Sequence, residues 1–388
     1  MSRFAIRAPR FFDGERMLEY PSVVLVDEGR ITGVERGTTV PDGWAARQHD
    51  GVLLPGLIDA HVHLCADGGP APFDRLADLT VEQTHATIEN SLRTHLAAGV
   101  TTVRDLGDYR NAMLTWRSRA VPGLPTVVAS GTPITSVGGH CAVLGGEVRD
   151  EPHLREAIRR QAELGADVVK IMASGGVLTP GTDTMSPQFT AEELRAAVDE
   201  AHRAGLPITA HAHALSAVRL ALEAGADGIE HCTCLTPEGV RIDDDLLAAL
   251  AESGTAVCPT LGADPNVVVP PQVVEMAARA GLTPGTLQKV VTGLHEGGVR
   301  LVAGSDGGIA PVKPHGLLPV TLQEYRQAGV PETAALTAAT SAAADACGLG
   351  DRKGRIRPGY DADLVIMKSD ALEPVAIYLA GHPVAASR

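Results

Sequence analysis

Aromatic residues make up only 3% of this 388-residue sequence, and its formal net charge is −14. A nucleic-acid backbone needs a basic surface, and single strands stack on aromatic side chains. The sequence offers neither, because its basic residues are scattered rather than clustered. We therefore expect no binding of nucleic acid.

Long apolar runs are also missing. A membrane-spanning helix needs at least about 18 consecutive apolar residues, and no such stretch occurs. The first ten residues contain Arg3, Arg7 and Arg10 but lack the apolar run of a secretory signal. We expect a cytoplasmic protein that does not act at membranes.

The cysteines form no C-x-x-C pair and no dense framework, which is typical of reduced thiols in an intracellular protein. Cys232 and Cys234 form a C-x-C pair, for which we favour small buried side chains over metal ligands. The six cysteines are Cys65, Cys141, Cys232, Cys234, Cys258 and Cys347.

Short β-type runs alternate with stretches of helical period from about residue 55 to residue 306, which predicts parallel strands joined by helices. Residues 191–204 are such a helix, with apolar residues at three- and four-residue steps. Eight units favour an α/β fold of the (β/α)₈ TIM-barrel type over an open doubly wound sheet. The predicted strands are 57–61, 100–105, 126–130, 167–172, 207–211, 228–231, 255–259 and 300–305.

The two ends of the sequence have a different pattern. Residues before about 55 contain short β runs at 22–26, 30–34 and 52–54, broken by glycine and proline. The run 364–367 follows a Pro-Gly turn and is expected to return and pair with those first strands. We predict a small β-sandwich domain from residues 1–55 plus 350–388, and a barrel from residues 56–349.

Residues that can bind metals fall at the carboxyl ends of the predicted strands, where barrel active sites are built. His61 and His63 end the first strand, and period-two alternation puts both on one face. Alone, the pair also fits a surface location. His211 and His231 end later strands, where an isolated histidine is more often part of the core. Asp306 closes the last strand, and its simpler interpretation is a helix N-cap.

Lys170 places a charged amine in a strand that should be buried, and an unpaired buried ammonium is costly. One interpretation is an inward salt bridge. The other is a lysine carboxylated by CO₂, whose anionic carbamate bridges two cations. We favour the carbamate, because the neighbouring histidines and Asp306 need a bridging anion to complete two metal sites.

A series of motifs, in this order, resembles the amidohydrolase superfamily, in particular its imidazolonepropionase-related, prolidase-like dipeptidase branch. The resemblance spans most of the chain. The motifs are P-G-L-I-D-A-H-V-H-L (55–64), A-G-V-T-T-V-R-D-L-G (98–107), G-G-H (138–140), V-V-K-I-M-A-S-G-G-V (168–177), T-A-H-A-H (209–213), G-I-E-H (228–231), A-G-S-D (303–306) and I-R-P-G-Y-D-A-D-L-V (356–365).

The resemblance implies a binuclear site with two divalent metal ions, for which zinc suits imidazole and carboxylate ligands. One ion would be held by His61, His63, carboxylated Lys170 and Asp306, and the other by Lys170, His211 and His231. In that family a hydroxide bridges the metals and attacks the substrate carbonyl. Asp306 would take the proton of the hydroxide and pass it to the leaving amine.

Three further residues receive roles by resemblance or by charge. His140 would hydrogen-bond the scissile carbonyl or a substrate carboxylate, and His213 would contact the substrate or support a ligand; structural roles fit both equally. For Arg104, an internal salt bridge with Asp105 or another barrel carboxylate is favoured over substrate binding.

The function that follows is hydrolysis of a small amide, such as a dipeptide or an N-acyl amino acid. An alternative is an imidazolonepropionase or mononuclear deaminase, which does not generally use a lysine carbamate. Another class is a non-catalytic scaffold, against which all six metal positions argue. Barrels of this kind often self-associate, and the net charge does not oppose a homo-oligomer.

The substrate would be shaped by the loops 65–80, 174–188, 261–271 and 307–319, whose few charges predict a neutral or apolar substrate group. Ala214-Leu215 and Cys232-Thr233-Cys234 depart from the family pattern. These changes leave the metal positions in place but weaken an inherited dipeptide specificity.

Overall fold

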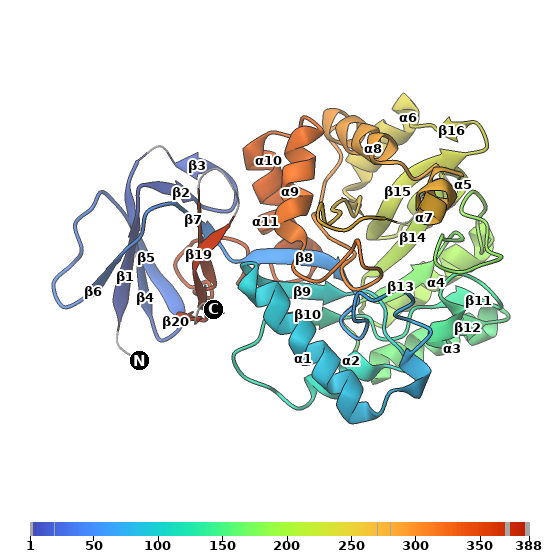
Figure 1. Cartoon of the computed structure of the whole chain (residues 1–388), viewed down its shortest axis with the longest axis horizontal. Helices are drawn as coiled ribbons and strands as arrows, with labels where there is room; N and C mark the ends of the chain where they lie inside the picture. Colours follow the sequence, from blue (N-terminus) through green and yellow to red (C-terminus); the bar gives the residue numbers. More distant parts are fainter. Residues whose placement is uncertain (1–2, 19, 270, 280, 369–372, 385–388) are drawn as a thin grey trace.

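The computed structural model of the chain describes residues 3–18, 20–269, 271–279, 281–368 and 373–384. A small β domain lies at one end of the molecule and carries both termini, and a larger domain of strands and helices lies beside it (Figure 1). This agrees with the predicted barrel and sandwich, whose boundaries at residues 55 and 350 stay a prediction.

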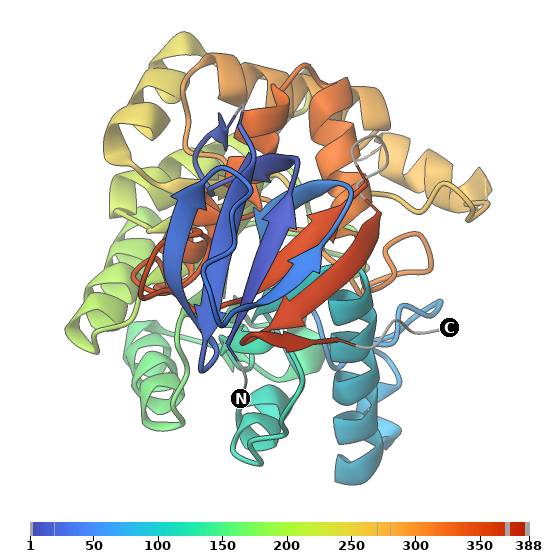
Figure 2. The same ribbon diagram turned by 90° about the vertical axis from the view of Figure 1, so that its left-hand side faces the viewer.

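Two sheets form the small domain, which faces the viewer in Figure 2. The strand order is β5-β4-β1-β6 in the 4-stranded sheet and β20-β19-β18-β7-β2-β3 in the 6-stranded sheet. The bounds are β1 (Phe4–Ala8), β2 (Arg10–Phe12), β3 (Met17–Leu18), β4 (Ser22–Asp27), β5 (Arg30–Arg36), β6 (Ala45–Gln48), β7 (Val52–Pro55), β18 (Leu364–Met367), β19 (Pro374–Leu379) and β20 (His382–Pro383).

Strands β7 and β18 connect the two domains. They pair antiparallel, with Leu364 opposite Pro55 and Met367 opposite Val52, so the predicted return of the last segment is confirmed. Period-two alternation divides their side chains between two cores. Leu53 joins the sandwich core, whereas Val52 and Leu54 join the core of the large domain.

Seven of the eight predicted barrel strands are strands in the structure. They pair in parallel as β8-β9-β10 and β13-β14-β15-β17. Their bounds are β8 (Leu57–Val62), β9 (Val100–Asp105), β10 (Thr126–Ala129), β13 (Val169–Met172), β14 (Ile208–Ala214), β15 (Gly228–Thr236) and β17 (Ala256–Cys258).

The prediction of a continuous eighth strand at 300–305 is wrong. This segment makes only isolated parallel bridges, Val257 to Leu301 and Val62 to Gly307. At Ser305 a side chain takes the place of a backbone partner: the Ser305 amide donates to Oδ1 of Asp59 (2.9 Å) instead of to a neighbouring strand. The segment still lies between β17 and β8, because Ala60 donates to the Ala303 carbonyl (3.0 Å) and Val302 to that of Val257 (2.9 Å). A similar bond from Asp167 to Ala129 (2.9 Å) joins the approach to β13 to β10.

Helices cover the outside of the barrel strands (Figures 1 and 2). The predicted helix at 191–204 is α4, which begins after a capping box of Thr190 and Glu193 and buries Leu194, Ala197 and Ala201. The helices are α1 (Val81–Ala97), α2 (Ala112–Arg117), α3 (Glu151–Glu163), α4 (Ala191–Arg203), α5 (Leu215–Ala224), α6 (Asp244–Ser253), α7 (Pro271–Arg279), α8 (Pro284–Glu296), α9 (Leu318–Gln327), α10 (Glu332–Ala338) and α11 (Ser341–Ala346), with 3₁₀ turns η1 (Leu76–Asp78) and η2 (Ala142–Leu144) and short strands β11 (Thr135–Ser136), β12 (Glu147–Val148) and β16 (Gly239–Val240).

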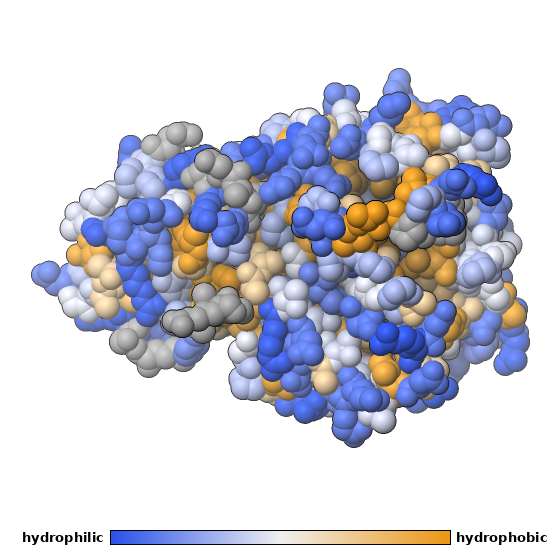
Figure 3. Space-filling model, in the orientation of Figure 1, coloured by the Kyte–Doolittle hydropathy of each residue, from blue (hydrophilic) through white to orange (hydrophobic). Residues whose placement is uncertain are grey.

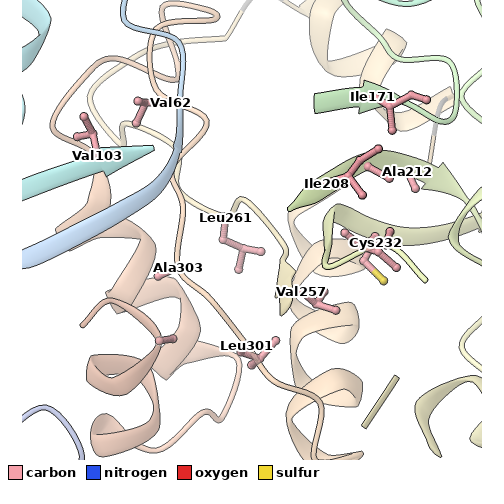
Figure 4. Packing of buried hydrophobic residues seen from close by; sticks show 14 of the residues in the cluster. Val62, Val103, Ile171, Ile208, Ala212, Cys232, Val257, Leu261, Leu301 and Ala303 are labelled. Carbon is pink, nitrogen blue, oxygen red and sulfur yellow. The ribbon is translucent and has the colours of Figure 1, made fainter. Parts of the chain in front are cut away.

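The main core joins strands and helices of the large domain, and Figure 4 labels ten of its buried side chains, among them Val62, Ile171 and Val257. All six cysteines are buried free thiols, in agreement with the prediction. Within the described ranges, none of the helices combines the length and hydropathy that a bilayer crossing demands.

Candidate active site

A cavity of about 450 Å³ opens at the carboxyl ends of the barrel strands. Every residue that the sequence predicted for the site lines it. These residues are His61, His63, His140, Lys170, His211, His213, His231 and Asp306. The structure therefore brings together residues that lie up to 245 positions apart, counted from His61 to Asp306.

The first group of the site consists of His61, His63 and Asp306. Oδ1 of Asp306 lies 3.5 Å from Nε2 of His61 and 3.2 Å from Nε2 of His63. Asp306 has the left-handed φ of 59°, and its amide donates to the His61 carbonyl (2.8 Å). The irregular end of the eighth segment thus aims this carboxylate at the histidine pair.

Glu230 is a functional neighbour that the sequence analysis missed. Its Oε2 accepts a hydrogen bond from Nδ1 of His61 (2.7 Å), and its Oε1 accepts from Arg104 (2.9 Å) and Thr209 (2.6 Å). Burial would raise the pKa of Glu230, but Arg104 and His61 outweigh it and lower that pKa. The barrel carboxylate that pairs with Arg104 is therefore Glu230, and the predicted internal salt bridge is confirmed.

Strand alternation hides Glu230 in the sequence, because neighbours in a strand normally point to opposite faces. His231 has a φ of 67°, and the register of β14 and β15 shifts between Ala212 and Ala214. This bulge turns His231 toward the cavity while Glu230 still reaches His61. The G-I-E-H motif contained both residues but gave no sign of the bulge.

His63 is oriented by the loop after β9. Its Nδ1 donates to the Gly107 carbonyl (2.9 Å), which leaves Nε2 directed at Asp306. Asp105 fixes this loop by accepting from the amides of Leu64 (2.7 Å) and Gly107 (3.2 Å). Burial raises the pKa of Asp105 to about 6, and the neighbouring His63 opposes that rise.

The second group consists of His211, His213 and His231, each able to offer one nitrogen within 4.8 Å of the others. Nδ1 of His231 bonds Oγ1 of Thr260 (2.7 Å), and Nε2 of His211 donates to the Gly175 carbonyl (3.2 Å). One nitrogen of each ring is thus occupied, and the other remains as a donor atom for a metal.

The pKa values of three of these rings, His61, His211 and His231, favour the neutral form that binds metal ions. Burial lowers the pKa of His61 to about 4, and it lowers the pKa values of His211 and His231 well below the ordinary range. Burial alone would also lower the pKa of His63, but the hydrogen bond and charge of Asp306 raise it. Neutral imidazole is the form that binds metal ions.

Lys170 lies in β13, in the buried wall of the cavity, and is 2% exposed. Among the described residues its Nζ has no hydrogen-bond partner and no carboxylate within 4.0 Å, so the inward salt bridge is not found. Burial lowers the pKa of Lys170, while Glu230 and Asp306 oppose the shift from a distance. Because the unprotonated amine is the form that reacts with CO₂, a lowered pKa favours that reaction.

His140 and His213 stand at the edges of the histidine cluster. Nδ1 of His140 bonds Oγ1 of Thr179 (3.0 Å), and its ring lies 4.6 Å from that of His211. A methyl group at residue 176 would lie 2.4 Å from Nε2 of His140, so the absence of a side chain at Gly176 leaves room for this ring. Nδ1 of His213 donates to Thr233 (2.8 Å), which leaves Nε2 free.

Lys313 also lines the cavity and was not predicted. Its Nζ donates to the carbonyls of Thr260 (2.6 Å) and Ser305 (3.1 Å), which ties the segments after β17 and before Asp306 together. Cys232 and Cys234 are fully buried with their sulfurs 4.0 Å apart, and neither lines the cavity. They are core residues, in line with the favoured interpretation.

The donor set fits divalent metal ions. Two groups of three side chains each present donor atoms within 4.8 Å of one another, and both groups face one cavity. Imidazole nitrogens with a carboxylate are the ligands of catalytic zinc sites. A third group, His61, Glu230 and Cys258, lies deeper, but Glu230 already pairs with His61 and Arg104 there.

Comparisons with known proteins agree with this geometry. The family model described as the amidohydrolase family matches residues 52–384. The chain is 26% identical over 365 residues to ochratoxinase of Aspergillus niger, covering 84% of this chain and 72% of that protein. It is 27% identical over 402 residues to imidazolonepropionase of Ralstonia nicotianae, covering 93% and 90%.

A crystal structure of a Xaa-Pro dipeptidase with bound methionine in the active site superposes with a TM-score of 0.84 at 24% identity, over 99% of this chain and 100% of that one. This likeness shows the fold. The predicted resemblance, which named both imidazolonepropionase and prolidase relatives, is confirmed.

Proposed function

The chain belongs to the amidohydrolase family, and from this membership we propose that it hydrolyses the C–N bond of a small amide with two divalent metal ions, most simply zinc. Hydrolysis of carbon–nitrogen bonds follows from the family, whose members depend on metals. The binuclear site and the amide substrate are the proposal. The observation that supports it is the convergence of two donor groups and an unpaired buried lysine on one cavity.

We assign His61, His63 and Asp306 to the first metal and His211 and His231 to the second. Once carboxylated, Lys170 would supply an anionic ligand for both ions. CO₂ adds to the neutral amine, which loses a proton and becomes an anionic carbamate. Two conditions favour this reaction at Lys170: burial, which lowers the pKa of its amine, and the lack of a carboxylate partner among the described residues.

When bound, the metal ions lower the pKa of water and polarise a substrate carbonyl. Asp306 acts on the proton: its carboxylate takes the proton of the attacking water and delivers it to the leaving nitrogen. His140 and His213 contact the substrate through their Nε2 atoms. Burial lowers their pKa values to about 3 and about 4, so that both rings act as neutral hydrogen-bonding groups.

A second candidate is cyclic C–N hydrolysis of the imidazolonepropionase or mononuclear deaminase type. It is favoured by the likeness to imidazolonepropionase, 27% identical over 93% of this chain. A mononuclear site would leave Lys170 buried and without a role. The non-catalytic scaffold is not favoured, because the family members found are hydrolases.

Metal content and mass test the proposal before any substrate is chosen. The protein is purified without chelators, its metal content is measured, and its intact mass is recorded under gentle conditions. We expect two ions per chain and an adduct of the mass of CO₂ that Lys170→Arg lacks. One ion and no adduct would support the mononuclear alternative, and absence of metal affinity would overturn both.

A further inference from the structure

The wall of the active-site cavity is apolar on several sides. Its large side chains come from the loops after the first, fourth and seventh strands, from helix α7 and from the segment after Asp306. They include Phe73, Val177, Leu178, Val269, Val274 and Ile309. The predicted substrate loops contain most of these residues. Helix α7, the turn that follows it and helix α8 add Ala277, Leu282 and Leu287 in turn, which the loop prediction did not include.

The rim of the cavity is apolar as well. Leu178 and Val274 are large apolar residues that line the cavity and yet are 43% and 53% exposed. Figure 3 shows hydrophobic residues gathered on this face, near α7 of Figure 1. Clustered exposed apolar side chains at a cavity mouth are typical of a surface that binds an apolar ligand.

Charged groups that could recognise a charged substrate are already engaged. Among the described lining residues, the charged ones are Lys170, Asp306 and Lys313. Lys170 and Asp306 belong to the proposed metal site, and Lys313 donates to two backbone carbonyls. No arginine lines the described wall. Outside the proposed metal site, a substrate carboxylate would therefore meet no free cationic side chain and a substrate ammonium no free carboxylate, and the desolvation of either group is costly.

We infer that the substrate is an uncharged amide with apolar groups on both sides of the scissile bond, and that free dipeptides are poor substrates. This inference rests on the proposed amide hydrolysis and adds the class of substrate. His140 and His213 remain as neutral hydrogen-bonding groups for the amide itself. The apolar wall then holds the rest of the molecule and excludes water from it.

Three matched amides test the inference. Butyryl-2-naphthylamide is uncharged, succinyl-2-naphthylamide carries a carboxylate on the acyl side, and the butyryl amide of 6-amino-2-naphthoate carries one on the amine side. We expect kcat/KM of the uncharged amide to exceed that of each charged amide by about tenfold or more. Equal values for the three would overturn the inference.

Val268 and Val269 give a matched pair of variants. Val269 lines the cavity, whereas Val268 is 91% exposed and is not among the lining residues. Val269→Asp should lower kcat/KM for the uncharged amide by about tenfold, and Val268→Asp should leave it unchanged. The same loss in both variants would mean that the cavity wall does not set specificity.

A binding measurement separates this inference from the proposed function. Calorimetry should show that 2-naphthylamine binds the metal-loaded protein more tightly than 6-amino-2-naphthoate, and that Val269→Asp weakens it. Faster hydrolysis of Ala-Pro than of any uncharged amide would refute the inference and leave amide hydrolysis standing. If no amide is hydrolysed with two ions bound, the proposed function fails, and equal affinity for the two amines would then overturn the inference too.

Discussion

The carboxylate of Glu230 orients the ring of His61 through a hydrogen bond, with 2.7 Å between Oε2 of Glu230 and Nδ1 of His61. Because a carboxylate accepts hydrogen bonds, Nδ1 carries the proton and Nε2 keeps its lone pair. That lone pair is directed toward the side where Asp306 lies, 3.5 Å away. Glu230 is thus a positioning residue for a proposed metal ligand.

Replacement of this carboxylate should weaken metal binding. Glu230→Gln removes the negative charge that fixes the tautomer of His61, and partners of this kind contribute about 10–100-fold to metal affinity. The loss of affinity is measured by titrating the metal ion into the metal-free protein in a calorimeter. Thr209→Val, which removes one hydrogen bond to Glu230 (2.6 Å), serves as a milder control. Unchanged affinity in Glu230→Gln would remove the residue from this role.

Asp306→Asn should keep the fold and lose activity. The amide cannot take the proton of the attacking water, so we expect kcat to fall by at least about 10²–10⁴-fold. Thermal melting and metal content are measured beside kcat, to separate loss of chemistry from loss of metal. Asp67→Asn, on an exposed loop where Asp67 pairs with Arg75, is the control. Turnover close to wild type in Asp306→Asn would contradict the proton transfer.

Lys170→Ala should lose bound metal and activity together, because the bridging anion is gone. Short carboxylic acids such as acetate should restore part of the activity if they occupy the place of the carbamate. Lys313→Ala removes a second lysine from the same cavity, and its defect should not respond to acetate. Rescue of both variants, or of neither, would argue against a carbamate at Lys170.

The metal-free protein should become less stable as the pH falls from about 6.5 to about 4. In the folded state the pKa values of His61 and His213 are about 4, whereas free histidine has a pKa near 6.5. Between these values the unfolded chain binds protons that the folded chain does not. The free energy of unfolding therefore decreases as the pH is lowered. Burial also lowers the pKa values of His211 and His231.

Buried carboxyls act in the opposite direction in part of this range. Burial raises the pKa of Asp59 and Asp105 to about 6 and of Asp108 to about 7. Below these values the folded state holds protons that the unfolded state releases. These three carboxyls therefore stabilise the fold at low pH, and that stabilisation is lost as the pH rises. The histidines are more numerous, and we expect the urea midpoint to drop between pH 6.5 and pH 4.5. A midpoint that rises in acid would contradict this expectation.

Much of the site could be predicted because barrel strands end at one face. The residues His61, His211 and His231 each follow a readable apolar run, and parallel strands bring their carboxyl ends together. The positions of seven strands followed from the same pattern. The strand positions and the histidines at the strand ends could be predicted because both follow from the local periodicity of the sequence.

Other features depend on contacts that no local pattern contains. Glu230 was missed because the left-handed turn at His231 breaks the alternation that assigns faces. The eighth strand was predicted as continuous, but Asp59 takes the Ser305 amide and interrupts the ladder. Lys313 reaches the site because its ammonium group ties two segments 45 residues apart, Thr260 and Ser305.

The start of the first barrel strand is also tied to the last part of the chain. Gly56 alone separates β7 from β8, and a methyl group there would lie 2.1 Å from Oγ1 of Thr101. The amides of Gly56 and Ile58 donate to Asp363 and Ala339, both at 2.8 Å. During synthesis, the acceptor of the Gly56 amide is therefore made 307 residues after Gly56 itself. Nascent chains that stop before Asp363 lack this acceptor and the partner strand of β7, so the joint between the two domains is completed only when the protein is almost fully translated.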